Sequence, residues 1–80
     1  MYYTYVLENE NGGLYIGQTS NLDARLGRHN SGRSTYTRNR GEWRLLFKKE
    51  FEIRSDAVRF EKYLKSLKNQ RYIREHFHEL

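Results

Sequence analysis

Cysteine and proline are absent from this 80-residue sequence. Without cysteine, the chain has no disulfide bridge, no thiolate nucleophile and no zinc site with cysteine ligands. Nothing requires an oxidising compartment, and we expect the protein to be cytoplasmic. Three histidines could still bind a metal, but His76 and His78 lie near the C-terminus, where chain ends fray.

Long hydrophobic runs are absent as well, since none exceeds three residues. A membrane-spanning helix needs about 20 apolar residues, so we expect no membrane partner. Met1 to Tyr5 lack the basic start and apolar stretch of a secretory signal peptide. The length predicts one small domain over residues 1–80, with a free energy of unfolding of about 4–12 kcal/mol.

Aromatic residues and positive charge are what the sequence has in abundance. Aromatic side chains make up 15% of the residues, which argues against disorder. The formal net charge is +5, and ten of the 15 cationic residues are arginine. Residues 1–24 have three acidic side chains and no lysine or arginine, whereas residues 25–44 have six arginines and one glutamate. Arginine suits bidentate phosphate contacts, so the cluster favours a nucleic-acid partner over a merely solvated basic surface.

The residue pattern predicts an α+β fold of order β-β-α-β-α-α. Strands are expected at 2–7, 14–17 and 43–53. Helices are expected at 21–30, from residue 55 onward and, as a third helix, after residue 69. The turn Asn9–Gly13 makes the first two strands a hairpin. We expect a three-stranded antiparallel sheet with helices packed on it. Spacing leaves the pairing of the third strand open.

Turn and cap residues set the expected element boundaries. Ser20 with Asp23 resembles a capping box for the first helix, and Gly32 is its expected terminator. A basic loop is expected over 33–42, and Ser55 is expected to cap the second helix. Two apolar faces are expected: Trp43, Leu45 and Phe47 on the third strand, and Ala57, Phe60, Leu64 and Leu67 on the second helix.

Polar residues beside these apolar stripes are the candidates for chemistry. Arg25 and His29 are four residues apart and share a helix face, where Arg25 can aim its head at a ligand or be a plain surface cation. Glu61 borders the stripe of the second helix, either as an ion-pair partner of Lys62, Lys65 or a loop arginine or as a metal ligand. Spacing leaves both interpretations open.

The two hairpin strands each present a tyrosine. Tyr5 and Tyr15 are expected to be near neighbours across the hairpin. Gly17 inside a strand indicates a bulge or a close approach of another group. Paired tyrosines on a sheet are more often core residues than catalysts, so these residues need further support.

Ordered motifs supply that support. They are Tyr3-Thr4-Tyr5, Tyr15-Ile16-Gly17, Thr19-Ser20-Asn21-Leu22, Arg25-x-x-x-His29-Asn30-Ser31-Gly32 and Glu61-Lys62-Tyr63-Leu64-Lys65. Together they resemble the GIY-YIG nuclease superfamily over nearly the whole chain, in particular small stand-alone bacterial members similar to the nuclease module of the bacterial excision-repair complex. The first triad lacks the family's glycine but keeps its last tyrosine, Tyr5.

The resemblance implies a phosphodiesterase, an endonuclease that uses Mg²⁺ or Mn²⁺. It implies the catalytic residues Tyr5, Tyr15, Arg25, His29 and Glu61, with Glu61 as the metal ligand. Nucleic-acid binding is expected from Arg28, Arg33, Arg38, Arg40 and Asn69. Asn69 has an alternative as a plain helix N-cap.

The residue types suit phosphodiester hydrolysis. Arg25 can clamp phosphate oxygens whose charge grows in the transition state, and Tyr5 would position water. The base stays open among Tyr15, His29 and a metal-bound hydroxide, because a phenol has a pKa of ~10, about three units above neutral.

DNA is the expected substrate rather than RNA, in repair or recombination. No second domain is expected to choose the target, so the substrate's structure or a protein partner would supply specificity. The alternative is a weakly active or inactive nucleic-acid binding module on the same fold. A pure protein-interaction domain would explain neither the arginine cluster nor the catalytic set.

Overall fold

The computed structural model describes residues 1–30, 42–67 and 69–77. Its elements follow the predicted order and confirm the α+β class. They are β1 (Tyr2–Asn9), β2 (Leu14–Thr19), α1 (Leu22–Asn30), β3 (Trp43–Phe51), α2 (Arg54–Leu67) and α3 (Gln70–His76). The expected terminator Gly32 and all of the expected basic loop except Glu42 lie outside the described residues.

The sheet has the strand order β2-β1-β3, and both pairings are antiparallel. The third strand therefore pairs with the first, which spacing had left open. The hairpin turn uses Gly12 at φ 87°, a left-handed conformation that glycine adopts without strain. Asn9 Oδ1 accepts hydrogen bonds from the backbone N–H groups of Asn11 and Gly13, at 3.1 and 2.6 Å.

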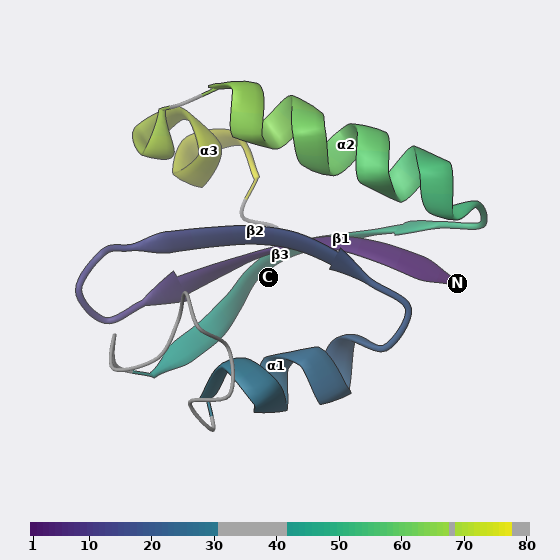
Figure 1. Cartoon of the computed structure of the whole chain (residues 1–80). Coiled ribbons are helices and arrows are strands. Elements are labelled where there is room, and N and C mark those ends of the chain that lie inside the picture. The colour runs from purple at the N-terminus through teal and green to yellow at the C-terminus, as the bar shows by residue number, and fades with distance from the viewer. Residues whose placement is uncertain (31–41, 68, 78–80) are drawn as a thin grey trace.

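Helices cover both faces of this sheet, which gives three layers (Figure 1). Helices α2 and α3 lie over one face, and α1 lies against the other. In the described part of the chain, no helix is long and apolar enough to cross a membrane.

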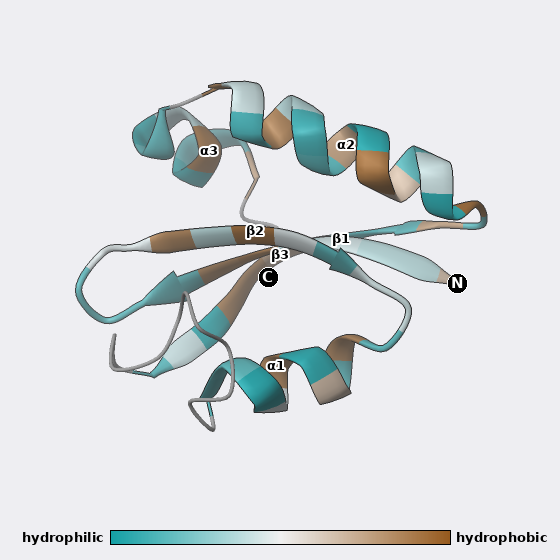
Figure 2. Ribbon diagram, viewed as in Figure 1, coloured by the Kyte–Doolittle hydropathy of each residue, from teal (hydrophilic) through white to brown (hydrophobic). Residues whose placement is uncertain are grey.

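The core under α2 and α3 is mostly apolar, and the buried hydroxyl of Thr4 donates to the Ala57 carbonyl of α2 at 2.7 Å. Its buried residues are Val6, Leu14, Phe47, Leu64 and Ile73. The predicted α2 stripe is confirmed, because Ala57 and Leu64 are buried and Phe60 and Leu67 pack against this core. Figure 2 shows hydrophobic residues recurring along α2 between hydrophilic ones, as an amphipathic helix requires.

The core on the α1 side is built from aromatic rings and leucines. Tyr5, Leu7 and Trp43 are buried there, and Leu22 and Leu26 of α1 pack against them. The prediction that Phe47 shares a face with Trp43 and Leu45 was wrong, since Phe47 belongs to the opposite core. The register explains the error: it shifts between Val6 and Leu7, and this β-bulge reverses the alternation along β3.

The helix starts also differ from the predicted caps. At α1, Asn21 rather than Ser20 accepts the backbone N–H of Ala24 through its side-chain oxygen, at 3.1 Å. The cap is therefore one residue closer to the helix than expected. Ser55 was expected to cap α2, but that helix already begins at Arg54. The Ile53 carbonyl accepts the N–H groups of Asp56 and Ala57 there.

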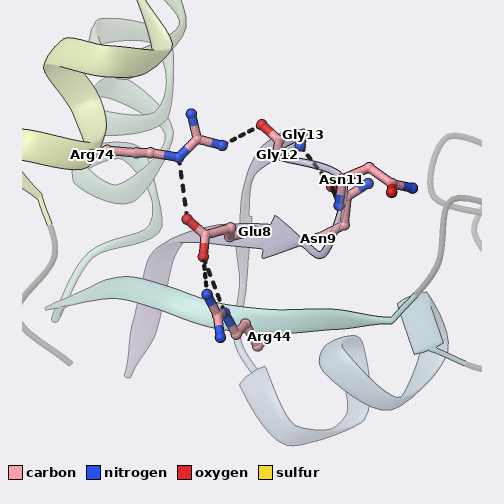
Figure 3. A network of polar contacts seen from close by, with 7 residues as sticks. All are labelled: Glu8, Asn9, Asn11, Gly12, Gly13, Arg44 and Arg74. Carbon is pink, nitrogen blue, oxygen red and sulfur yellow. Dashed lines mark hydrogen bonds and ion pairs between the residues drawn. The ribbon is translucent and has the colours of Figure 1, made fainter.

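A carboxylate between two arginines ties three elements together (Figure 3). Glu8 of β1 accepts hydrogen bonds from Arg44 of β3, at 3.0 Å to Nε, and from Arg74 of α3, at 3.2 Å. Arg74 also donates to the carbonyl of Gly12 in the hairpin turn. The bonds from Arg44, and secondarily those from Arg74, lower the pKa of Glu8. The network holds α3 and β3 against the hairpin.

Candidate active site

Tyr5 is the centre of the polar groups on the α1 side of the sheet. It lies on the central strand β1 and has no exposed surface. Its Oη is 3.2 Å from His29 Nε2, and this hydrogen bond links the sheet to α1. His29 is also buried, with 2% of its surface exposed. The two groups form a polar pair inside a largely apolar layer, so each supplies the hydrogen-bond partner that the other needs when buried.

Gly17 makes room for Tyr5. The two residues are opposite each other in the hairpin, and the ring of Tyr5 passes over the glycine. A Cβ at position 17 would lie 2.6 Å from Tyr5 Oη and 2.8 Å from Cζ, too close for any side chain. The expected close approach is therefore confirmed. The alternative, a bulge, does not form here, because the β1–β2 register runs unshifted from Tyr3–Thr19 to Glu8–Leu14.

Tyr15 lies beside this pair and is more accessible. Its ring centroid is 4.5 Å from that of His29 and 6.2 Å from that of Tyr5, which confirms the expected proximity of the two tyrosines. Trp43 meets the Tyr15 ring edge to face at 6.5 Å. Tyr15 is half-buried rather than enclosed, so it can contact a ligand that the buried pair cannot reach.

The protonation states follow from this burial. Burial first, and then the neighbouring Tyr15, raise the pKa of Tyr5 to about 12, against the opposing effect of Arg25. Burial, followed by the charges of Arg25 and Arg28, lowers the pKa of His29 from its ordinary value of 6.5. Near neutral pH, Tyr5 keeps its proton and His29 is a neutral imidazole. His29 can therefore accept a proton, whereas Tyr5 can only donate a hydrogen bond or be held by one.

Arg25 adds a permanent positive charge to the group. It lies one turn before His29 on α1 and is half-buried. Its guanidinium is close enough to the Tyr5 hydroxyl to oppose the rise in the pKa of Tyr5, and its charge lowers the pKa of His29. The expected shared face of Arg25 and His29 is thereby confirmed. Arg28 is exposed on the same helix, close enough for its charge to act on His29.

Glu61 approaches from the opposite layer. It lies on α2, and its charge nevertheless contributes to the raised pKa of Tyr5. Its Oε2 is 2.7 Å from Nζ of Lys65, so the ion pair that spacing allowed is present. The side chain is 18% exposed, so it is largely covered but still reaches solvent. A metal-binding role for Glu61 stays a prediction.

The donor set suits one particular kind of metal. Among residues 1–30, 42–67 and 69–77, no three His, Cys, Asp or Glu side chains lie close enough to enclose an ion. Mg²⁺ needs no such cage, because it binds through one or two carboxylates and keeps several waters. A single carboxylate that still reaches solvent fits this hard cation, and Glu61 is the residue that would hold it.

Among the remaining predicted binding residues, the structure describes Asn69. The side chain of Asn69 accepts the backbone N–H of Tyr72 at 3.1 Å and is the N-cap of α3, so the alternative role is present. Arg33, Arg38 and Arg40 lie outside the described residues.

Asn30 positions the site, and the sequence arguments assigned it no role. Its side chain donates to the carbonyl of Trp43 at 2.9 Å and accepts the N–H of Trp43 at 2.6 Å. This pair of bonds fixes the end of α1 beside the start of β3, directly after His29. An asparagine following a candidate histidine within one motif was the available signal.

Comparison with known proteins gives a consistent picture. The family profile of the GIY-YIG catalytic domain matches residues 1–77. Domains of this family are in general endonucleases that act on DNA.

Several bacterial proteins are similar along most of their length. UPF0213 protein BH0048 of Halalkalibacterium halodurans is 37% identical over 71 residues, which cover 88% of this chain and 76% of that protein. UPF0213 protein BLi00048/BL00536 of Bacillus licheniformis is 41% identical, with 92% of this chain and 80% of that protein covered. The solution NMR structure of UPF0213 protein BH0048 from Bacillus halodurans matches with a TM-score of 0.56 at 36% identity, over 90% of this chain and 79% of that one.

Proposed function

Because the chain belongs to the GIY-YIG catalytic domain family, we propose that it is a divalent-metal-dependent endonuclease that hydrolyses phosphodiester bonds in DNA. The observation that carries this proposal is the convergence of four groups on one face of the sheet. Tyr5, Tyr15, Arg25 and His29 meet there, and the charge of Glu61 reaches them from the other layer.

Accessibility divides these groups into two sets with different tasks. Tyr15, Arg25 and Glu61 are partly exposed and can touch a substrate, whereas Tyr5 and His29 are buried behind them. Arg25 binds the oxygens of the phosphate under attack and stabilises the charge that grows there. The buried pair positions the others, since Tyr5 holds His29 and Arg25 in place.

Proton removal from the attacking water falls to the Tyr15–His29 pair. Tyr15 is the member that a water in the site can contact. His29, neutral because burial and Arg25 lower its pKa, can accept a proton passed on by Tyr15. Tyr5 is unsuited as a base because its pKa is raised to about 12.

Glu61 is the residue that would hold Mg²⁺ or Mn²⁺. When bound, such an ion polarises the phosphate and stabilises the leaving oxygen. Phosphate contacts by arginine carry no sequence information. Target choice is therefore expected to come from the structure of the DNA or from a protein partner, in repair or recombination.

The proposal is tested by a cleavage assay on branched, flapped, nicked, single-stranded and duplex DNA, with and without Mg²⁺ or Mn²⁺. The purified protein should cut at least one substrate only when metal is added. Glu61→Gln should lower the single-turnover rate at least about 10²-fold, a loss comparable with that of one transition-state contact, and should leave DNA binding intact.

Glu75→Gln is the matched control, because Glu75 also forms an ion pair one helical turn from its partner, Arg71. A surface ion pair alone is worth only about 0–1 kcal/mol, so this variant should cut normally. Equal rates for the two glutamine variants would eliminate the metal role of Glu61. A folded wild-type protein that binds DNA but cuts none of the substrates would support the binding-module alternative.

A further inference from the structure

Glu61 and Lys65 form a close ion pair one helical turn apart on α2, in which the glutamate is largely covered and the lysine is exposed. Nζ and Oε2 are 2.7 Å apart, and the glutamate side chain is 18% exposed. The corresponding pair on α3, Arg71 with Glu75, is 3.3 Å long, and its glutamate is 54% exposed. Shielding from water strengthens the attraction between charges. Lys65 is therefore the ion-pair partner that the structure gives this carboxylate, through an exposed side chain.

The ammonium of Lys65 competes with any cation for Glu61. It is hydrogen-bonded to Oε2 of the carboxylate, and its charge repels a second cation. A hard ion such as Mg²⁺ that relies on one carboxylate has few other protein ligands to offset this repulsion. A cation can bind Glu61 well only after Lys65 has moved away.

The ammonium group of Lys65 has a second position available to it. It lines a groove of about 340 Å³ along the outer edge of β2, together with the half-buried Tyr15. The lysine side chain is 55% exposed, and its flexible stem lets the ammonium reorient. A DNA phosphate at the rim of this groove would attract the ammonium.

We propose that Lys65 couples metal binding to substrate binding by exchanging partners: it neutralises Glu61 in the free protein and moves to a DNA phosphate in the complex. This proposal rests on the metal-dependent nuclease function inferred above. The phosphate draws Lys65 away and frees Glu61 for the cation. By linkage, DNA then raises the affinity for metal by the same factor by which metal raises the affinity for DNA.

The direct test measures Mn²⁺ binding in the absence of DNA, from the electron paramagnetic resonance signal of the free ion. Lys65→Met removes the charge and keeps an unbranched side chain of similar length. It should bind Mn²⁺ at least about tenfold more tightly than wild type, which corresponds to ~1.4 kcal/mol.

Lys62→Met is the control, because Lys62 carries the same charge on the same helix and forms no ion pair within the described residues. Its affinity should stay within about twofold of wild type, since one exposed charge at a greater distance is largely screened. The double variant Lys65→Met with Glu61→Gln should lose the gain. Equal affinities of the two lysine variants, or a gain that survives in the double variant, would overturn the proposal.

A second arm measures the coupling itself. A short DNA oligonucleotide should raise the Mn²⁺ affinity of wild type several-fold more than that of Lys65→Met, after subtraction of Mn²⁺ bound to DNA alone. An oligonucleotide with an uncharged methylphosphonate backbone should give wild type no such gain. An equal gain in both proteins would overturn the exchange of partners.

These results separate this inference from the nuclease proposal. Tighter Mn²⁺ binding by Lys65→Met in a protein that cuts no DNA would support the competition and reject the nuclease activity. Metal-dependent cutting that Glu61→Gln abolishes, together with equal affinities of the two lysine variants, would reject the competition alone.

Discussion

The two faces of the sheet are built from different materials. The face under α2 and α3 is closed mainly by Val6, Leu14, Phe47, Leu64 and Ile73, and the Thr4 hydroxyl buried there donates to a backbone carbonyl of α2. The face against α1 buries a hydroxyl and an imidazole among its rings and leucines. Strand β1 contributes residues to both faces, since successive residues of a strand point to opposite sides of the sheet.

The difference shows how a small domain can combine stability with chemistry. An apolar core gains free energy from every carbon it buries. A buried hydroxyl or imidazole adds little net stability and needs a partner to avoid a penalty. Both faces gain stability from buried apolar surface, Leu64 and Val6 on the α2 side and Trp43 and Leu7 on the α1 side, and the α1 face in addition holds polar groups in fixed positions.

The largest expected effect comes from opening the apolar face. Leu64→Ala removes a fully buried side chain and should lower the free energy of unfolding by about 2–5 kcal/mol. Urea titrations followed by the fluorescence of Trp43, the one tryptophan in the chain, measure this loss. Lys62→Ala on the exposed side of α2 should change the value by less than about 0.5 kcal/mol. Similar losses for both variants would contradict the assignment of stability to this face.

On the α1 face, by contrast, we expect a substitution to cost little stability and much activity. Tyr5→Phe keeps the ring but removes the hydroxyl that bonds to His29, and should cost only about 0.5–1.5 kcal/mol of stability. We expect the single-turnover cleavage rate to fall about 10²-fold, because His29 and Arg25 lose their common anchor.

The pH profile of the rate distinguishes positioning by Tyr5 from a loss of folded protein. A positioning role predicts that the profile of Tyr5→Phe changes shape, whereas partial unfolding would scale it uniformly. An unchanged rate in the folded variant would remove Tyr5 from the site.

The smallest effect is a pH dependence of stability that originates at His29. Its pKa is lowered by folding from 6.5, so the unfolded chain binds the proton more readily. Stability is therefore complete above about pH 6.5 and falls as the pH drops through the lowered pKa of the folded state. Urea titrations between about pH 7.5 and 5 should show this decline, above the range in which Glu8 titrates.

His29→Gln should flatten that part of the pH profile of stability. The control His76→Gln, at an exposed position of α3, should leave it intact. A decline that persists unchanged in His29→Gln would show that another group is responsible.

Local signals predicted the elements well because they are encoded by neighbouring residues. Asn9–Gly13 indicated the hairpin, and the repeat of Ala57, Phe60, Leu64 and Leu67 predicted the buried stripe of α2. Arg25 and His29 were placed on one face by their spacing alone. Gly17 indicated a close approach before Tyr5 was known to be the residue that approaches.

Where a residue's partner lies far along the chain, local signals did not suffice. The bulge opposite Val6 and Leu7 sent Phe47 to the other core, and nothing within β3 itself indicates that shift. The bonds from Asn30 to Trp43 join residues that only the fold brings together.

The sequence by itself determined the order of the elements, the basic character of the chain and the motif that indicates a nuclease. Only the tertiary structure decided that Tyr5 is enclosed while Tyr15 is accessible, because burial depends on what α1 covers. It also decided that the charge of Glu61 on α2 acts on Tyr5 on β1, since long-range electrostatics follow distance in space rather than along the chain.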